Sequence, residues 1–323
     1  MVRRIFAVLL LLFAMALLIG VGALLGTTPI GTRVLSSFGT PTPTPKPILT
    51  IQGTPPAVGA KAAYLLDADT GHVLVNVNGE QRLPMASTTK IMTAFIALQA
   101  ADLQQVVTVK QDAVDEVKKN QGSSAFLVVG DKIRLLDLLY ALMLPSGDDA
   151  AITIADAISG SPAQFVVTMN QYAQRLHLKQ THYINPDGLT YLTAQNKPDP
   201  QHYTSAADLV QITRIALENP LFAQIVALQE YKLPATAEHH AYDWMTTDDL
   251  LSAYPGAIGV KTGFTLEAGY CLVFSAINVG HHLIGVVLND STQKPNQRFT
   301  DAIKLLDWGF ALPLRPPPTP GAK

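Results

Sequence analysis

Three short polar motifs, far apart in the chain, constrain its fold more than any other feature. They are Ser-Thr-Thr-Lys at residues 87–90, Ser-Gly-Asp at 146–148 and Lys-Thr-Gly at 261–263. Together they supply a serine nucleophile with a lysine three positions later, a second hydroxyl for proton transfer, and a cationic strand edge that can hold a carboxylate. These are the groups of an acyl-transfer site, so we expect the fold to bring all three segments to one cleft.

The first motif is expected to open a helix that begins near Ser87 and continues to about Ala100. On a helix, side chains three positions apart lie on one face with Cβ atoms about 5 to 6 Å apart, so Lys90 can reach Ser87. The apolar neighbour Ile91 and the like charge of Lys261 would both favour the neutral amine that a base requires. Taken singly, the first two motifs would also fit helix N-termini, but the three together favour a reactive site.

The order of predicted elements indicates an α/β fold of the α+β kind. Strands are predicted near both ends of the region, at residues 62–66, 72–77, 270–278 and 282–288. Apolar residues at helical spacing mark the middle, at residues 133–143, 150–158 and 162–176, and a last helix is expected at about 296–310. This pattern predicts one antiparallel sheet flanked by helices, with a helical subdomain inserted.

Longer stretches around the motifs resemble one family, the serine-type D-alanyl-D-alanine carboxypeptidases, which are low-molecular-mass penicillin-binding proteins. The similar stretches are residues 83–94, 185–189 and 259–271, and the resemblance extends from about Ala62 to about Phe310. It implies a β-lactamase/transpeptidase-like fold and removal of the terminal D-alanine from peptidoglycan stem peptides through an acyl-enzyme. It also implies that β-lactam antibiotics acylate the same serine.

The resemblance assigns a role to each motif residue. By this resemblance Ser87 is the acyl-ester nucleophile, Lys90 is the general base and Ser146 relays protons. The residues that it assigns to substrate binding are Asp148, Lys261, Thr262, Gly263, Phe264 through its backbone amide in an oxyanion hole, and Arg298. The ammonium and hydroxyl of the third motif suit a terminal carboxylate, and its glycine permits close backbone approach.

Position 148 departs from the Ser-Gly-Asn that is common in this family. An asparagine can donate and accept hydrogen bonds, whereas an ionised Asp148 can only accept. Pairing with Lys90 would also weaken that lysine as a base. One alternative is therefore a non-catalytic penicillin- or muropeptide-binding protein. The other alternative is a serine β-lactamase, which shares the first and third motifs. The β-lactamase fits less well, because no glutamate for deacylation occurs between Ser161 and Asp199.

Charge and cysteine content exclude several classes of function. A net charge of −2 and an isoelectric point near 6.4 leave no basic excess for binding nucleic acid. Cys271 is the single cysteine, so the chain can form no intrachain disulfide and offers no thiolate cluster for zinc or iron–sulfur. The histidines lack metal-binding spacing, and we expect no metal and no cofactor.

The N-terminus predicts export from the cytoplasm. Arg3 and Arg4 precede an uncharged run at residues 5–25, which as a helix would be about 31 Å long and could span a bilayer. We expect residues 1–26 to be a signal or membrane anchor that stays attached and holds the protein outside the cytoplasmic membrane. Secretion after signal cleavage is the alternative.

Proline content sets the other boundaries. Alternating threonine and proline at residues 40–47 predict an extended linker, which we assign to 27–60. The catalytic domain is expected at 61–312. We assign residues 313–323 to a Pro-rich tail. No helix is expected there, because proline lacks the amide donor that a helix needs.

Overall fold

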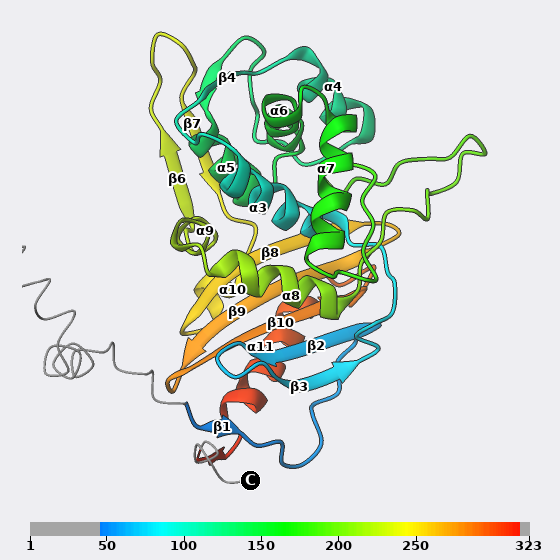
Figure 1. The fold of residues 1–323 in the computed structure, drawn as a ribbon, viewed down its shortest axis with the longest axis vertical. Helices are drawn as coiled ribbons and strands as arrows, with labels where there is room; N and C mark the ends of the chain where they lie inside the picture. The colour runs from blue at the N-terminus through cyan, green and yellow to red at the C-terminus, as the bar shows by residue number, and fades with distance from the viewer. Residues whose placement is uncertain (1–45, 317–323) are drawn as a thin grey trace, which may run out of the picture. The chain divides into compact units, whose positions relative to one another are not determined.

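A five-stranded antiparallel sheet lies at the centre of the fold in the computed structural model, which describes residues 46–316 (Figure 1). Its strand order is β3-β2-β10-β9-β8, so β8 lies at one edge. The strands are β2 (Ala62–Asp67), β3 (His72–Val77), β8 (Ala257–Thr265), β9 (Gly269–Asn278) and β10 (His281–Leu288). The antiparallel sheet predicted from the terminal strands is confirmed.

Helices cover both faces of this sheet. Helix α8 (Ala206–Leu217) packs on β10 and β2, and α11 (Gln297–Phe310) packs on β10 and β9 from the other side (Figure 1). Side chains alternate between the faces of a strand, so Ile284 and Val286 join the core with α8 while Leu283 and Val287 join the core with α11. Burial on both faces explains why β10 is apolar throughout.

The helical subdomain lies between β3 and β8 in the chain. Its helices are η1 (Ala86–Thr89), α3 (Lys90–Ala100), α4 (Gln111–Asn120), α5 (Leu135–Met143), α6 (Asp148–Ser159), α7 (Pro162–Arg175), α9 (Pro220–Val226) and α10 (Leu250–Ala253), in addition to α8. The subdomain also contains two two-stranded antiparallel sheets, which we call ribbons. One pairs β4 (Val106–Thr108) with β5 (Lys132–Arg134), and the other pairs β6 (Glu230–Leu233) with β7 (Tyr242–Met245). The inserted helical subdomain is confirmed. The helix predicted from residue 133 begins instead at Leu135, because Ile133 pairs with Val107 in the first ribbon.

Local sequence explains where these helices begin and end. Helix α6 stops at Gly160, whose φ of 79° lies in the left-handed region that favours glycine. Helix α7 then starts at Pro162, and the Ser161 hydroxyl accepts a hydrogen bond from the Gln164 amide at 3.3 Å. Proline at the first helical position after a capping serine is a strong start signal.

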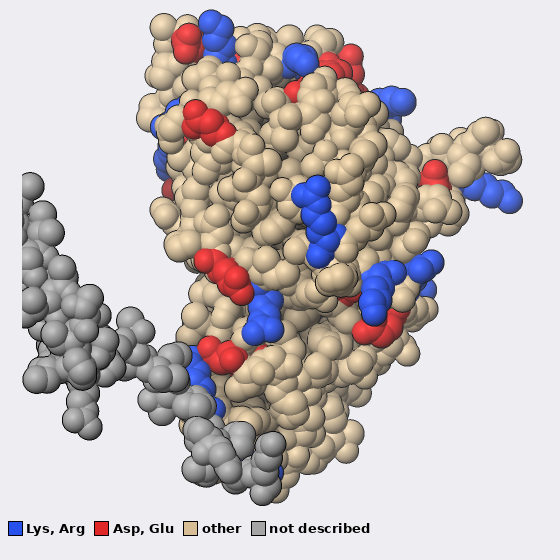
Figure 2. Space-filling model, in the orientation of Figure 1, with Lys and Arg blue, Asp and Glu red and all other residues tan. Residues whose placement is uncertain are grey.

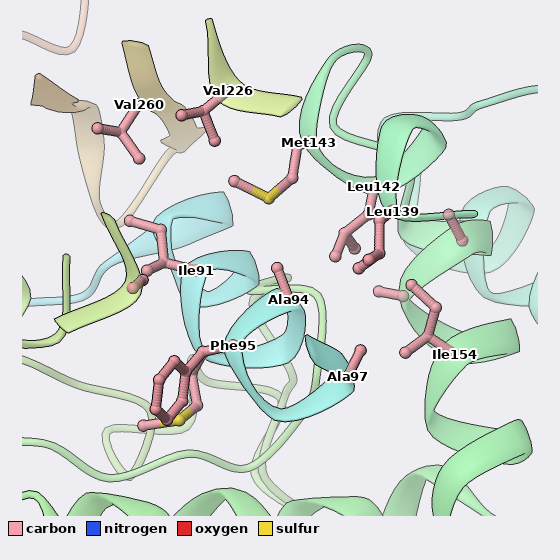
Figure 3. Close-up of a cluster of buried hydrophobic side chains, with 14 of the residues drawn as sticks. Ile91, Ala94, Phe95, Ala97, Leu139, Leu142, Met143, Ile154, Val226 and Val260 are labelled. Carbon is pink, nitrogen blue, oxygen red and sulfur yellow. The ribbon is translucent and has the colours of Figure 1, made fainter. Parts of the chain in front are cut away.

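The core of the subdomain is built around α3 (Figure 3). Ile91, Ala94 and Ala97 of this helix point into a cluster of side chains from other elements. These neighbours include Leu139, Leu142 and Met143 of α5, Ile154 of α6, Val226 of α9 and Val260 of β8. A helix that is buried on nearly all sides cannot shift without disturbing this packing, so the residues at its N-terminus stand on a rigid support.

The two ends of the described chain pair with each other. Strand β1 (Ile48–Leu49) runs antiparallel to β11 (Leu314–Arg315), and residues 47–316 form one compact unit. This unit includes short segments that the sequence assigned to the linker and to the Pro-rich tail. The predicted signal or anchor at 1–26 lies outside the described residues.

On the face in Figure 2, charged side chains of both signs are scattered among neutral ones. No single described helix is long and apolar enough to cross a membrane, although α6 and α7, which meet at 83°, satisfy length and composition as a pair.

Candidate active site

Ser87 and Lys90 lie at the junction between η1 and α3. The chain enters as a tight 3-10 turn that contains Ser87 and continues as the α-helix whose first residue is Lys90. In a 3-10 turn, side chains three positions apart are nearly eclipsed, which aligns these two residues directly. The Lys90 Nζ atom lies 2.9 Å from Ser87 Oγ. The contact predicted from the motif spacing is therefore present.

Lys90 is fully buried and its ammonium group is completely hydrogen-bonded. Besides Ser87 Oγ, it donates to Asp148 Oδ1 at 2.5 Å and to the Asp187 carbonyl oxygen at 2.7 Å. An ammonium has three N–H donors, and all three are used here. This set of acceptors fixes the nitrogen beside the serine hydroxyl.

Asp148 is the first residue of α6 and is also buried. Burial raises the pKa of its carboxyl, and the positive charge of Lys90 acts in the opposite direction. Its second oxygen, Oδ2, has no hydrogen-bond partner among the described residues. A side chain at Gly122 would collide with this oxygen, so glycine at that position lets the loop after α4 close over the carboxyl.

Ser146 presents a free hydroxyl to the same site. Its φ of 65° is unusual for a residue with a side chain, and such strained conformations occur mainly where a site requires them. Ser146 is buried, and within residues 46–316 its Oγ has no hydrogen-bond partner. A buried hydroxyl without a partner is available to a substrate or to a proton-transfer step.

Strand β8 carries the third motif along one side of the site. Lys261 is buried and its ammonium donates to the Thr262 carbonyl oxygen at 3.0 Å. Burial, helped by the positive charge of Lys90, lowers the pKa of Lys261 well below its ordinary value. The Thr262 hydroxyl lies 2.6 Å from the Thr247 hydroxyl.

Two glycines let the backbone approach the nucleophile closely. A Cβ atom at Gly263 would stand 3.0 Å from the Ser87 amide nitrogen, which places β8 directly against the reactive turn. On the other side, a Cβ at Gly188 would collide with the Ala86 carbonyl oxygen. Gly188 has a φ of 94°, so glycine is favoured there by backbone conformation as well as by space.

These groups surround a cleft of about 320 Å³. Its lining includes Ser87, Ser146, Asp148, Thr262, Gly263, Phe264 and Arg298. The Arg298 guanidinium is half-buried over the Tyr270 ring, with its central carbon 5.0 Å from the ring centroid. Lys261 lies beneath this lining rather than in it, so Arg298 is the cation that faces the cleft within the described chain.

A model of D-alanyl-D-alanine carboxypeptidases matches residues 50–292 of this chain. The chain belongs to the D-alanyl-D-alanine carboxypeptidase family. A D-alanyl-D-alanine carboxypeptidase of Streptomyces sp. strain K15 is 39% identical over 297 residues, which cover 88% of this chain and 97% of the relative. The D-alanyl-D-alanine carboxypeptidase DacF of Bacillus subtilis is 35% identical over 253 residues, which cover 78% of this chain and 62% of the relative.

Solved structures show the same fold. The crystal structure of the Streptomyces K15 DD-transpeptidase aligns with a TM-score of 0.74 and 36% identity, covering 80% of this chain and all of that one. Penicillin binding protein 5 of Haemophilus influenzae aligns with a TM-score of 0.71 and 31% identity, covering 80% of this chain and 73% of that one. The predicted β-lactamase/transpeptidase-like fold is confirmed.

In this D-alanyl-D-alanine carboxypeptidase family member, the motifs did not reveal every residue of the site. Thr247 has no sequence signal that would place it opposite Thr262. Asp187 stands in a stretch that resembles the family, yet only the structure shows that its carbonyl holds Lys90. Burial, with a further contribution from the negative charge of Asp148, raises the pKa of the Asp187 carboxyl to about 8.

One group of side chains elsewhere could hold a metal ion by position. Ligand atoms of Asp67, Asp69 and His281 lie within 4.8 Å of one another. The Asp67 carboxylate already accepts hydrogen bonds from the Asp69 amide at 3.1 Å and the Thr70 hydroxyl at 2.8 Å. These bonds form an ordinary turn between β2 and β3, and none of the three residues lines the cleft.

Proposed function

We propose that this chain is a serine-type D-alanyl-D-alanine carboxypeptidase that removes the terminal D-alanine from peptidoglycan stem peptides. The observation that carries the proposal is the distance of 2.9 Å between Lys90 Nζ and Ser87 Oγ, at a cleft bounded by β8. A serine beside a buried lysine is an activated nucleophile. The family of the chain and the names of its relatives support the same reaction.

Acylation begins when Ser87 Oγ attacks the carbonyl carbon of the penultimate D-alanine. As the C–O bond forms, the hydroxyl proton moves to the neutral amine of Lys90, and the carbonyl oxygen gains the negative charge. We assign the stabilisation of that charge to the backbone amides of Ser87 and Phe264. The close approach of Gly263 to the Ser87 amide supports this assignment.

Release of D-alanine needs a proton on the leaving nitrogen. When the C–N bond breaks, the proton held by Lys90 passes through the Ser146 hydroxyl to that nitrogen. The buried and unpartnered Oγ of Ser146 supports this role. Water then attacks the ester carbonyl and gives its proton to Lys90, and the Ser87 oxygen recovers this proton as the shortened peptide leaves.

The terminal carboxylate of the substrate is assigned to the Thr262 end of the cleft. Thr262 offers a hydroxyl and Arg298 a cation that faces the cleft. Lys261 lies behind them, so it acts on the substrate through its hold on the Thr262 carbonyl rather than by lining the cleft. A requirement for a free C-terminus follows from this arrangement.

Two assays test the proposal. A fluorescent penicillin should label the protein, with the adduct on Ser87 by intact mass and peptide mapping, and a D-Ala-D-Ala peptide should release D-alanine. Labelling without release would instead support the non-catalytic penicillin-binding alternative. Rapid loss of the label with formation of hydrolysed penicillin would support a β-lactamase.

A transpeptidase is a second candidate, because the aligned Streptomyces K15 structure is described as a DD-transpeptidase. The acyl-enzyme on Ser87 would be the same, and an amine would replace water as the attacking group. Adding glycylglycine to the peptide assay distinguishes the two. A new peptide product at the expense of the hydrolysis product would indicate transpeptidation.

We also propose that the chain works outside the cytoplasmic membrane and stays attached to it through residues 1–26. The support is the uncharged run at residues 5–25 after Arg3 and Arg4. Cell fractionation should recover the full-length protein with membranes. A mature protein that begins after Ala16 or Gly22 and is found free in the medium would show that the segment is a cleaved signal peptide.

A further inference from the structure

The backbone immediately before the nucleophile adopts a strained conformation. Ala86 has a φ of 47°, a left-handed value that is uncommon for a residue with a Cβ atom. Such conformations persist only where the surrounding contacts hold them, and they are concentrated at functional sites. Ala86 is buried and directly precedes Ser87. The contacts that hold this peptide unit therefore act on the nucleophile itself.

Two groups fix the carbonyl of Ala86. The Thr89 hydroxyl donates a hydrogen bond to the Ala86 carbonyl oxygen at 2.8 Å. Gly188 approaches the same oxygen so closely that a Cβ atom at Gly188 would collide with it. Thr89 is fully buried, so its hydroxyl is shielded from water. One hydroxyl and one backbone contact thus set the direction of this carbonyl.

The Thr89 hydroxyl is itself held by His202. The Nε2 atom of His202 lies 2.8 Å from Thr89 Oγ1, and its Nδ1 atom accepts a hydrogen bond from the Ile184 amide at 3.1 Å. Burial lowers the pKa of His202 to about 3, so the ring is neutral and carries one N–H. Because Nδ1 accepts, that proton lies on Nε2 and is donated to Thr89. The proton of the Thr89 hydroxyl is then directed to the Ala86 carbonyl.

The direction of the Ala86 carbonyl determines where the Ser87 amide points. A trans peptide unit is planar, so the carbonyl of one residue and the N–H of the next point in opposite directions. The carbonyl is held on the side of Thr89, which directs the Ser87 N–H away from that side. Strand β8 lies against this amide, since a Cβ atom at Gly263 would stand 3.0 Å from the Ser87 nitrogen. This is the place assigned above to the oxyanion.

We propose that Thr89 and His202 are positioning residues that hold the Ser87 amide in the direction of the oxyanion. The hydrogen bonds run from His202 to Thr89 and from Thr89 to the Ala86 carbonyl, and the rigid peptide unit passes the orientation on to Ser87. Neither Thr89 nor His202 lines the cleft, so neither acts by touching the substrate. This inference deepens the proposed function and rests on its acyl-enzyme at Ser87.

The direct test is Thr89→Val, which keeps the shape of the side chain and removes the hydroxyl. A fluorescent penicillin first titrates the active sites, so that kcat is expressed per site rather than per mole of protein. Per site, kcat for a D-Ala-D-Ala peptide should fall by about 10- to 100-fold, the scale of a displaced oxyanion donor. Thr89→Ser keeps the hydroxyl and should retain most of the wild-type kcat.

Two further measurements distinguish positioning from a general loss of structure. Acylation and deacylation both pass through an oxyanion, so both should slow together in Thr89→Val, and KM should stay within about 2-fold of the wild-type value. A peptide boronic acid, whose boron takes the place of the reacting carbonyl carbon, mimics the tetrahedral state. Its inhibition constant should rise by a factor similar to the fall in kcat.

A pair of variants separates the two nitrogens of His202. His202→Gln brings an amide nitrogen near the position of Nε2 and keeps a donor to Thr89. His202→Asn keeps only an acceptor for the Ile184 amide near the position of Nδ1. The kcat per site should therefore be higher in His202→Gln than in His202→Asn. This comparison decides the case if Thr89→Val does not fold.

The chain offers a matched control at a distance from the cleft lining. The buried Ser275 hydroxyl lies 2.7 Å from His282 Nε2 and 3.1 Å from the Leu283 carbonyl oxygen, which is the same arrangement of histidine, hydroxyl and carbonyl. Ser275 does not line the cleft. Ser275→Ala should lower the melting temperature and keep the wild-type kcat per site.

The outcomes separate this inference from the proposed function. A per-site kcat in Thr89→Val equal to that of the wild type, or a lower kcat with an unchanged inhibition constant for the boronic acid, would overturn the inference. Equal kcat in the two His202 variants would overturn the role of His202. A wild type that penicillin labels but that releases no D-alanine would overturn the proposed function instead. The penicillin acylation rates of the same variants would then still test the positioning, because that acylation also passes through an oxyanion.

Discussion

The Lys90 ammonium and the Asp148 carboxyl lie 2.5 Å apart, and both side chains are buried. A lysine that acts as a base must be neutral during the step in which it takes the serine proton, and an ionised neighbour favours the charged form instead. The family's usual asparagine would keep the hydrogen bond without this charge. Asp148 therefore couples the base to a titratable group inside the site.

Asp148→Asn should raise kcat/KM for a D-Ala-D-Ala peptide, most of all near neutral pH. The amide restores a donor toward the substrate and removes the negative charge beside Lys90, and a hydrogen bond of this kind is worth about 1 to 3 kcal/mol, or roughly 5- to 150-fold. Burial raises the pKa of Asp148, so its carboxyl regains a proton at a higher pH than an exposed aspartate does. The ratio of kcat/KM between the variant and the wild type should therefore become smaller as pH falls. A variant no faster than the wild type at any pH would refute this role.

Lys90→Ala should lower the rate of penicillin acylation by about 100-fold or more, the usual scale for a lost general base. It also leaves Asp148 buried without its partner, and breaking a buried pair in this way costs about 3 to 5 kcal/mol of stability. Lys90→Ala combined with Asp148→Asn should recover much of the melting temperature but none of the acylation rate. Near-normal acylation in either variant would show that another residue activates Ser87.

Ser87→Ala should abolish covalent labelling by penicillin. The matched control is Ser291→Ala, because Ser291 also has a lysine three positions later. Its hydroxyl instead accepts backbone hydrogen bonds from Gln293 and Lys294 in an exposed turn. The control should label as the wild type does. A penicillin adduct detected by intact mass in Ser87→Ala would show that another residue is the nucleophile.

Asp187→Asn should change the pH dependence of stability. The buried Asp187 carboxyl has its pKa raised from 3.8 to about 8, so the folded state keeps a proton that the unfolded chain releases above about pH 4. The free energy of unfolding of the wild type therefore falls as pH rises from about 4 to about 8. The asparagine keeps the acceptor for the Leu189 amide but has no proton to lose.

The measurement is the melting temperature of both proteins between pH 5 and pH 8. As pH rises, the melting temperature of the variant should increase relative to that of the wild type. Each kcal/mol of difference in the free energy of unfolding corresponds to about 2 to 4 °C. Asp199→Asn, in the loop that follows, is the control and should track the wild type at every pH. A constant difference between Asp187→Asn and the wild type would mean that Asp187 does not hold a proton in the folded state.

The sequence predicted the parts of this molecule that depend on periodicity and close spacing. The terminal strands follow from alternation and apolar runs, and the Ser87–Lys90 contact follows from a three-residue step on a helix. The ribbons β4–β5 and β6–β7 were not predicted, because such short strands are stabilised by packing on neighbouring helices rather than by a pattern of their own.

The site could be predicted only as far as its motifs reach. The position of Lys261 beneath the cleft depends on which face of β8 carries its side chain. The sequence of the strand alone does not determine that face. The carbonyl of Asp187 contributes to the site through backbone geometry, which any residue type could supply. Likewise, the collision that a side chain at Gly188 would cause is visible only once Ala86 lies beside it.

Because β1 pairs with β11, the chain enters the compact unit and leaves it at neighbouring positions. These positions lie beyond the edge of the sheet that is far from the helical subdomain (Figure 1). A segment attached before β1 and a segment attached after β11 would therefore both leave the unit from the same side. An attachment at the first strand and one at the last would therefore lie at nearly the same distance from the cleft.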